Sequence, residues 1–188
     1  MAATRTLAGV VLPASGTWVF DASHSHLEFS VRHMMVGKTR GRFAAFTGTI
    51  VVADEPAKSS VHMEAETASI DTRDEGRDTH LRSADFLDVE KNPKITFTST
   101  SVTGEGTSWT VVGDLTIKGV TKSVSIETLL EGVIDKDPWG NARVAFSGEA
   151  EINREDFGLT WNVALDAGGV LVGKTVKISF EVEAVKQA

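Results

Sequence analysis

The sequence predicts an all-β protein, a single antiparallel barrel of about eight strands with a short helical insert. Its 188 residues include fifty β-branched ones (22 Val, 20 Thr and 8 Ile) against 11 Leu and 4 Met, a composition typical of strands. From residue 17 onward, segments of alternating apolar and polar residues follow one another between turn residues. Strands of about ten residues, roughly 33 Å long, leave long exposed edges unless the sheet closes. A sandwich of two stacked sheets is the alternative, because alternation alone is compatible with both.

Residues 1–16 are expected to form an N-terminal arm, and residues 17–188 a single barrel domain. The apolar stretch from Leu7 to Leu12 ends at Pro13. It is too short for the hydrophobic part of a secretory signal and far too short to span a bilayer. We therefore expect a cytoplasmic protein, with the periplasm or secretion as the alternative.

Strict alternation predicts strands along the barrel domain. Leu27, Phe29 and Val31 alternate with polar neighbours, and residues 61–66 and 176–183 repeat the pattern. Similar patterns predict further strands at residues 94–103, 108–118, 123–133 and 142–153.

Two places depart from this alternation. Phe43 and Phe46 are three residues apart, so they share one face of the sheet only if a bulge or bend lies near Ala44 and Ala45. Between residues 71 and 89 there are few β-branched residues. We expect a short helix over residues 77–86 in this stretch.

The expected helix has recognisable terminal and side-chain signals. Thr72 and Asp74 are candidate N-cap residues, and Asp78 and Arg82 are spaced for an ion pair four residues apart. A solvated helix with internal ion pairs is the plain interpretation of this charged segment.

Composition excludes several classes of function. The net charge is −7 and no basic run is present, so we expect no nucleic acid partner. There is no cysteine, which excludes disulfides, thiolate nucleophiles and thiolate metal sites. Hydrophobic residues make up 41% and charged residues 24%, which is typical of a folded globular protein.

Three histidines near the N-terminus raise an enzymatic alternative. His24, His26 and His33 could serve a hydrolase or a metalloenzyme. On a strand, however, His24 and His26 share a face that His33 does not. The sequence also lacks GxSxG, P-loop and HExxH motifs. We expect hydrogen-bonded histidines at the barrel rim, no catalytic residue and no metal ligand.

Several longer motifs stand out along the chain. They are residues 18–21 (WVFD) with His24 and Ser25, 29–33 (FSVRH), 40–43 (RGRF) with Phe46 and Gly48, 69–72 (SIDT), 77–86 (RDTHLRSADF), 93–97 (PKITF), 113–122 (GDLTIKGVTK), 138–140 (PWG) and 153–159 (NREDFGL). Together they resemble the YceI-like family over nearly the whole chain. The resemblance implies a lipocalin-like barrel that binds polyisoprenoid lipids, and it carries over no catalytic residue.

The function expected from this resemblance is non-catalytic binding, storage or transport of a polyisoprenoid or similar lipophilic molecule. The bound lipid would be a polyprenyl chain, a quinone or a polyprenyl phosphate, and no other cofactor is expected. A scavenger of hydrophobic toxins or antibiotics would use the same cavity. Transient membrane contact for ligand exchange and a homodimer are further expectations.

The expected binding residues fall into two groups, an apolar lining and polar contacts. Alternation and the resemblance predict an apolar lining of Phe29, Val31, Phe43, Phe46, Met63, Phe97, Trp109, Leu115, Ile126, Phe146 and Phe180. Polar contacts are expected from Arg32, Arg77 and His80, and arginine suits an anionic head group. The arginines near the recognised motifs are Arg32, Arg40, Arg42, Arg77 and Arg82. Because an apolar lumen needs shielding, we expect the helical insert to cover one barrel end through Leu81, Phe86 and Leu87.

Overall fold

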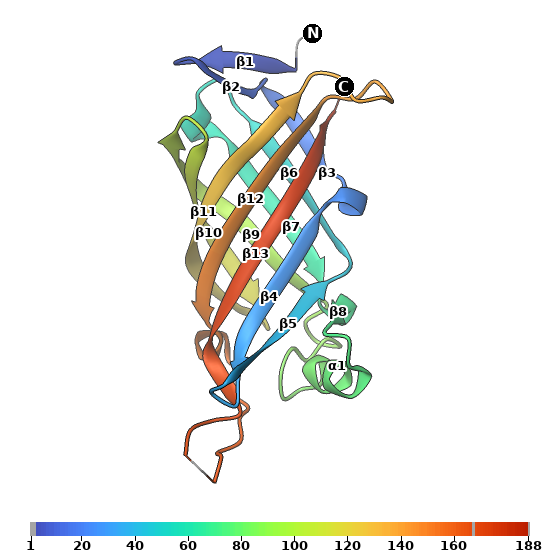
Figure 1. Cartoon of the computed structure of the whole chain (residues 1–188), viewed down its shortest axis with the longest axis vertical. Coiled ribbons are helices and arrows are strands. Elements are labelled where there is room, and N and C mark those ends of the chain that lie inside the picture. The colour runs from blue at the N-terminus through green and yellow to red at the C-terminus, as the bar shows by residue number, and fades with distance from the viewer. Residues whose placement is uncertain (1–2, 167, 188) are drawn as a thin grey trace.

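The computed structural model describes residues 3–166 and 168–187, and it confirms the lipocalin-like antiparallel barrel. Eight strands pair in the closed order β12-β11-β10-β9-β7-β6-β3-β13, and β13 pairs again with β12 (Figure 1). The eight strands are β3 (Gly16–Phe20), β6 (Phe46–Val52), β7 (Ser60–Glu66), β9 (Lys94–Glu105), β10 (Ser108–Ile117), β11 (Val120–Ile134), β12 (Arg143–Asn153) and β13 (Val172–Lys186).

Three further strands extend the barrel wall towards one end. β4 (His26–His33) follows β3 after the short 3-10 turn η1 (Ala22–His24), and β4 pairs with β13 as β3 does. β5 (Gly37–Phe43) pairs with β4 and leads into β6. β8 (Ile70–Asp71) follows β7 after η3 (Thr67–Ser69) and pairs with β5. β3/β4, β5/β6 and β7/β8 are therefore three long strands, each with one bend.

The bend between β5 and β6 lies at Ala44 and Ala45, as predicted. Here the Ala44 amide donates to the Ser69 carbonyl and the Glu66 amide donates to the Ala45 carbonyl. The four strands predicted at residues 94–153 are also present, with ends within three residues of the predicted ones.

The N-terminal arm is a β-hairpin that lies across one end of the barrel, which we call the hairpin end (Figure 1). It consists of β1 (Thr4–Leu7) and β2 (Val10–Pro13). The Ala3 amide donates to Asp135 Oδ1 at 2.9 Å, and Arg5 donates to the carbonyls of Ala53 and Asp54, each at 2.7 Å. Trp18 is fully buried beneath this hairpin.

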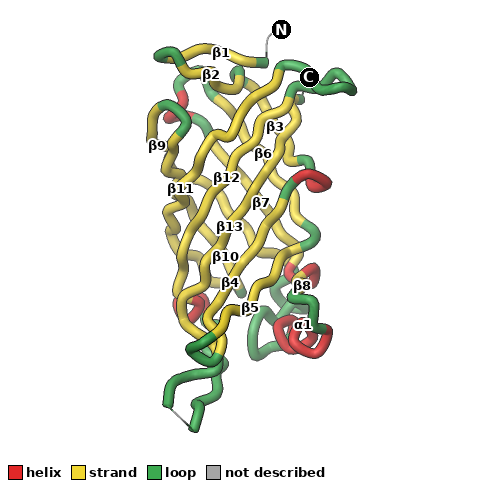
Figure 2. Tube along the Cα trace, viewed as in Figure 1, coloured by secondary structure: helices red, strands yellow, loops and turns green. Residues whose placement is uncertain are grey.

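The helix lies at the opposite end, which we call the helix end (Figure 2). α1 spans Glu75–Arg82, and its N-cap Asp74 accepts a hydrogen bond from the Arg77 amide at 2.9 Å. The predicted helix was therefore placed too late in the chain: Phe86 lies in the turns that follow. Asp78 is buried and accepts from the Thr72 amide instead of pairing with Arg82. Among the described residues, no helix is long and apolar enough to cross a membrane.

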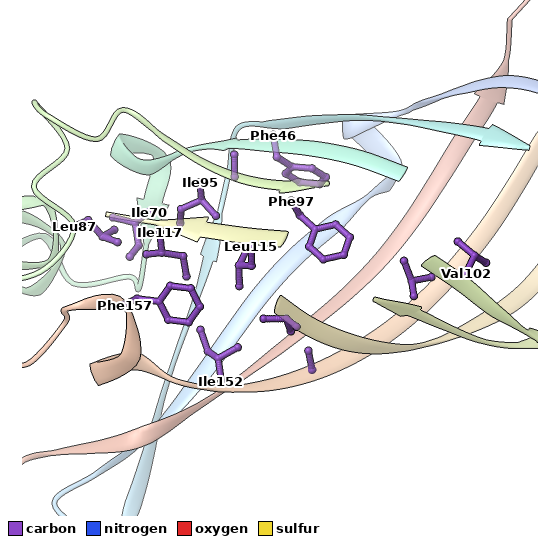
Figure 3. Packing of buried hydrophobic residues seen from close by; sticks show 14 residues of the cluster. Phe46, Ile70, Leu87, Ile95, Phe97, Val102, Leu115, Ile117, Ile152 and Phe157 are labelled. Atoms are coloured by element: carbon purple, nitrogen blue, oxygen red, sulfur yellow. The ribbon is translucent and has the colours of Figure 1, made fainter. Parts of the chain in front are cut away.

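Inward-facing apolar side chains form two clusters. The larger one begins at the helix end, where Leu87, Ile70, Ile117 and Phe157 lie close together, and runs into the middle of the barrel (Figure 3). The smaller cluster lies beneath the hairpin and includes Trp18. The interior is apolar along its length, as expected when one face of every strand is buried.

Candidate functional site

The barrel interior contains a cavity of about 310 Å³ that reaches from the hairpin end to the helix end. This volume lies within the range of about 300–1,000 Å³ that is usual for small-molecule sites. Of the described residues on its wall, the polar or charged ones are Arg5, Glu28, Ser59, Thr128 and Arg154. An eight-stranded barrel leaves only a narrow interior, so the cavity is suited to a slender apolar molecule.

All eleven apolar residues predicted for the lining lie on the wall of this cavity. They come from strands that include β4, β9, β10 and β13. Alternation assigned those within one strand to the inner face, and Phe43 and Phe46 share that face across the bend at Ala44 and Ala45. Their contact with a ligand stays a prediction, since the geometry defines the wall and not its occupant.

Four phenylalanines of the wall lie over glycines of the neighbouring strands. The pairs are Phe20 with Gly48, Phe29 with Gly41, Phe97 with Gly113 and Phe180 with Gly148. A Cβ atom at any of these glycines would overlap the neighbouring ring. The rings therefore occupy space that glycine leaves free along the wall.

Apolar side chains from the helical insert form part of the wall at the helix end. Leu81, Phe86 and Leu87 line the cavity, and Phe86 and Leu87 are buried. The Trp161 ring centroid lies 5.3 Å from that of Phe86. The insert has the position expected of a cover, and whether it controls ligand exchange stays a prediction.

Arg154 is a charged residue of the cavity wall at the helix end that the sequence-based site did not include. It lies in η4 (Arg154–Phe157) and is only 3% exposed. Its guanidinium donates to the carbonyls of Gly173 at 2.8 Å, Trp161 at 3.1 Å and Val172 at 3.3 Å, and also to that of Leu159. Burial lowers the pKa of Arg154. The available signal was its place in the motif at residues 153–159.

Two polar atoms on the wall have no hydrogen-bond partner among the described residues. They are Arg5 Nε and Thr128 Oγ1, and both are buried from solvent. Arg5 extends from the hairpin that covers one end, whereas Thr128 is on β11 opposite Trp109. Buried polar atoms are normally paired, so these two are candidates for contact with a polar group in the cavity.

Near the hairpin end, Arg143 on β12 is held by carboxylates. Its guanidinium contacts Asp137 Oδ2 and Asp21 Oδ2, each at 2.7 Å, and Glu183 Oε2 at 3.2 Å. Hydrogen bonds from Ser23, Arg143 and His24 lower the pKa of Asp21 well below its usual range. Burial alone would raise the pKa of Asp137, but hydrogen bonds from Arg143 and from the Asn141 and Trp139 amides outweigh it and lower the pKa to about 2.

The three polar site residues predicted from the motifs do not lie on the cavity wall. Arg32 is exposed on the outer face of β4, opposite in direction to Val31. Arg77 donates to Thr72 Oγ1 at 2.7 Å. His80 hydrogen bonds to Asp85 at 2.9 Å and packs its ring edge-on against Trp161. Their placement corrects the expectation that they border the cavity. Membership of a motif does not specify which face of a strand or helix a side chain occupies.

The other candidate arginines also lie outside the wall. Arg40 is exposed on β5, and Arg42 pairs with Asp71 at 3.0 Å. Arg82 donates to the carbonyls of Ala68 and Ile70. Arg42 therefore links β5 to β8, and Arg82 links the helix to the segment that contains Ala68 and Ile70.

The histidine cluster lacks the geometry of a serine–histidine relay. His24 Nδ1 lies 2.9 Å from Asp21 Oδ2 and 3.0 Å from Ser23 Oγ, so both partners meet the same ring nitrogen. A relay needs the serine and the carboxylate on different nitrogens. His26 lies opposite Glu181 and His33 opposite Gly37, on different parts of β4. Over residues 3–166 and 168–187, no group of three or more His, Asp or Glu side chains is arranged to hold a metal ion.

The fold and its interior define a closed eight-stranded barrel protein with an apolar internal cavity. A family model described as the YceI-like domain matches residues 18–184. The chain belongs to the YceI-like family. The N-terminal hairpin precedes the matched residues.

Similar proteins agree with this assignment. A UPF0312 protein of Pectobacterium atrosepticum is 38% identical over 181 residues, covering 96% of this chain and 91% of the relative. Protein YceI of Escherichia coli is 39% identical over 168 residues, covering 89% and 84%.

Solved structures share the fold. The YceI protein of Campylobacter jejuni aligns with a TM-score of 0.70 at 26% identity, covering 84% of this chain and 90% of that protein. BcnA of Burkholderia cenocepacia aligns with a TM-score of 0.73 at 24% identity, covering 87% and 98%. A domain of Saccharophagus degradans described as polyisoprenoid-binding has a TM-score of 0.68 at 16% identity, covering 93% and 100%.

Proposed function

We propose that this protein binds a polyisoprenoid or a similar lipophilic molecule inside the barrel without transforming it. The observation that carries the proposal is the cavity inside the barrel with an almost entirely apolar wall. The Saccharophagus degradans neighbour, described as a polyisoprenoid-binding domain, supports the same class of ligand.

The physical chemistry of the wall suits a long apolar chain. Each buried methylene-sized group contributes about 0.8 kcal/mol, so a few isoprene units are enough for micromolar binding after the cost of ordering is subtracted. A polyprenyl chain, a quinone or a polyprenyl phosphate could fill such a cavity. Arg5 on the hairpin side and Arg154 on the helix side are cations on the described cavity wall, and arginine suits an anionic head group.

Storage, transport and scavenging of hydrophobic toxins would all use this cavity. A carrier of one lipid should prefer a narrow set of chain lengths, whereas a scavenger should accept unrelated apolar molecules with similar affinity. A competition series of polyprenyl lipids and hydrophobic antibiotics separates these roles. Hydrolysis by the histidine cluster is less favoured, because Ser23 and Asp21 share one nitrogen of His24.

The test combines identification of the native ligand with uptake of a fluorescent polyprenyl probe. Organic extraction and mass spectrometry of the purified protein should yield an isoprenoid lipid. Phe97→Asp should reduce probe affinity by about a hundredfold or more, because it places an unpaired charge on the apolar wall. Val51→Asp is the matched control, since Val51 is 43% exposed and is not on the cavity wall.

A second variant separates loss of binding from loss of folding. Ile126→Trp adds apolar volume to the wall without a charge, so the barrel should fold and the probe should bind at least about tenfold more weakly. Circular dichroism and thermal unfolding verify the fold of each variant. Equal probe binding by wild type, folded Phe97→Asp and folded Ile126→Trp would place the ligand outside the cavity and overturn the proposal.

A further inference from the structure

An exposed apolar tip projects beside the helix end of the barrel. It consists of Met34, Met35 and Val36, in the turn between β4 and β5, together with Val163. Their exposed fractions are 45%, 59%, 85% and 45%, respectively. These are large values for neighbouring apolar side chains, and such patches usually mark a contact with another molecule.

Backbone hydrogen bonds hold the two parts of the apolar tip side by side. The Met34 amide donates to the Leu171 carbonyl at 2.8 Å, and the Leu171 amide donates to the Val163 carbonyl at 2.9 Å. The turn and the segment before β13 also lie together at the bottom of Figure 1. The two segments of the tip are therefore fixed relative to each other by main-chain hydrogen bonds.

The turn itself has an unfavourable backbone. Met34 and Met35 have φ values of 49° and 62°, in the left-handed region that glycine and asparagine adopt more readily. Two methionines here cost folding stability that Asn-Gly would not. Such strain is common where a local sequence serves a function other than stability.

The strands that lead to the tip carry an unbalanced positive charge. Arg32 and Lys38 lie directly opposite each other across β4 and β5, and Arg40 lies one outward-facing position further along. Like charges in opposing positions destabilise a sheet. Within the described residues, none of these three cations takes part in an ion pair.

This positive charge is local, because the whole chain has a net charge of −7. Residues 29–53 contain four lysines and arginines and no aspartate or glutamate. Of the four, Arg42 is the one paired with a carboxylate, that of Asp71. The single carboxylate in residues 158–171 is Asp166. Apolar side chains at a tip with cations just behind them fit the layers of an anionic lipid surface, where hydrocarbon lies beneath charged head groups.

The apolar tip is also close to the cavity. Val31 precedes the turn by three residues and lines the cavity, as do Leu159 and Val172 in the adjoining segments. A membrane contact here would bring lipid next to the helix end, where the insert forms part of the wall.

We propose that the apolar tip and the cations Arg32, Lys38 and Arg40 dock this protein on an anionic lipid bilayer. Met34, Met35, Val36 and Val163 would enter the head-group boundary, and the three cations would contact lipid phosphates. The contact is peripheral and reversible, because only a few side chains enter the bilayer. This inference goes beyond the proposed binding function and does not depend on the ligand in the cavity.

The test uses vesicles without polyprenyl lipid, so it is independent of cavity binding. Wild-type protein should sediment with vesicles of phosphatidylcholine that contain about 30% phosphatidylglycerol. Binding to phosphatidylcholine alone, or to anionic vesicles in about 0.5 M salt, should be at least about tenfold weaker, because salt screens the cations.

Two variants divide the surface into its apolar and cationic parts. Met35→Ser combined with Val36→Ser should weaken vesicle binding by about tenfold, and so should Lys38→Gln combined with Arg40→Gln. The matched controls are Val51→Ser with Leu129→Ser on the barrel wall, and Lys58→Gln with Lys136→Gln, which lie away from the tip. Both controls should bind vesicles within about twofold of wild type.

A fluorescence measurement locates the contact directly. Val36→Trp should be quenched by brominated lipids, and Val51→Trp should not. Met35→Ser with Val36→Ser should still bind the polyprenyl probe, since neither residue lines the cavity. Equal vesicle binding by wild type and both tip variants would overturn the proposal. A dimer in sedimentation analysis that Met35→Ser with Val36→Ser abolishes, without vesicle binding by wild type, would assign the tip to a second copy and also overturn it.

Discussion

Carboxylates surround Arg143 near the hairpin end of the barrel, whereas backbone carbonyls surround Arg154 at the helix end. Arg143 contacts three carboxylates, and Arg154 donates to four carbonyls. Carboxylates titrate and carbonyls do not. The two regions should therefore respond differently to pH although an arginine joins several chain segments in each.

The largest expected effect is the loss of Arg154. Arg154→Met leaves several buried carbonyls without a donor, so it should lower the free energy of unfolding by about 3 kcal/mol or more. Urea unfolding measures the change. Arg154→Lys keeps the charge but cannot reach four carbonyls, so its free energy of unfolding should lie between those of wild type and Arg154→Met. A loss below about 1 kcal/mol for Arg154→Met would mean that the segment before β13 does not depend on this residue.

The second prediction separates the two regions by acid titration. The pKa of Asp137 is about 2 in the folded protein, against 3.8 ordinarily. A carboxyl with a lowered pKa stabilises the fold fully above its unfolded pKa, and this contribution is lost as the pH falls towards the folded value. Stability should thus decline from about pH 5 to about pH 2, with Asp21 acting in the same direction.

Asp137→Asn should flatten this decline, whereas Arg154→Met should keep the wild-type slope at a lower overall stability. Urea midpoints measured across the pH series distinguish these results. If Arg154→Met changed the slope as much as Asp137→Asn, the contrast between carboxylate and carbonyl partners would be lost.

A smaller effect is expected on the rate at which a polyprenyl probe is released, and it should differ between the helical insert and the N-terminal hairpin. Leu81→Ser with Phe86→Ser should raise the release rate of a polyprenyl probe by about tenfold with little change in association, because loosening a cover mainly affects dissociation. Leu12→Ser at the hairpin should raise it less, since the hairpin stays attached through Ala3 and Arg5. Stopped-flow release tests both. Faster release from folded Leu12→Ser than from the double variant would identify the hairpin as the exchange end.

The sequence was sufficient for the wall but not for its polar contacts. Alternation places every second residue on the same face, so Phe97 and Phe180 could be assigned to the interior from local pattern alone. Arg32 was assigned from a motif, although its neighbour Val31 already pointed inward. Applying alternation to both would have placed Arg32 outside.

Arg154 could not be found in this way, because its partners are backbone carbonyls contributed by residues 159–173. Main-chain acceptors leave no mark in the side-chain pattern. The hairpin was missed for a different reason: its turn is Ala8-Gly9, with Ala8 at a φ of 50°, which a sequence pattern seldom indicates. The helix begins at Glu75, before the predicted residue 77, because Asp74, one of the two N-cap candidates, caps it.

The phenylalanines that lie over glycines make the width of the interior adjustable in small steps. Replacing Gly48 by alanine would displace the Phe20 ring, because the three atoms nearest to the new Cβ all belong to that ring. A Cβ atom at Gly41, Gly113 or Gly148 would also meet a ring, but at Gly113 and Gly148 it would meet a backbone carbonyl oxygen as well. Relatives with an identical strand number and pairing could therefore admit molecules of different cross-section through one substitution each. Selectivity in such a barrel can diverge without any change in its architecture.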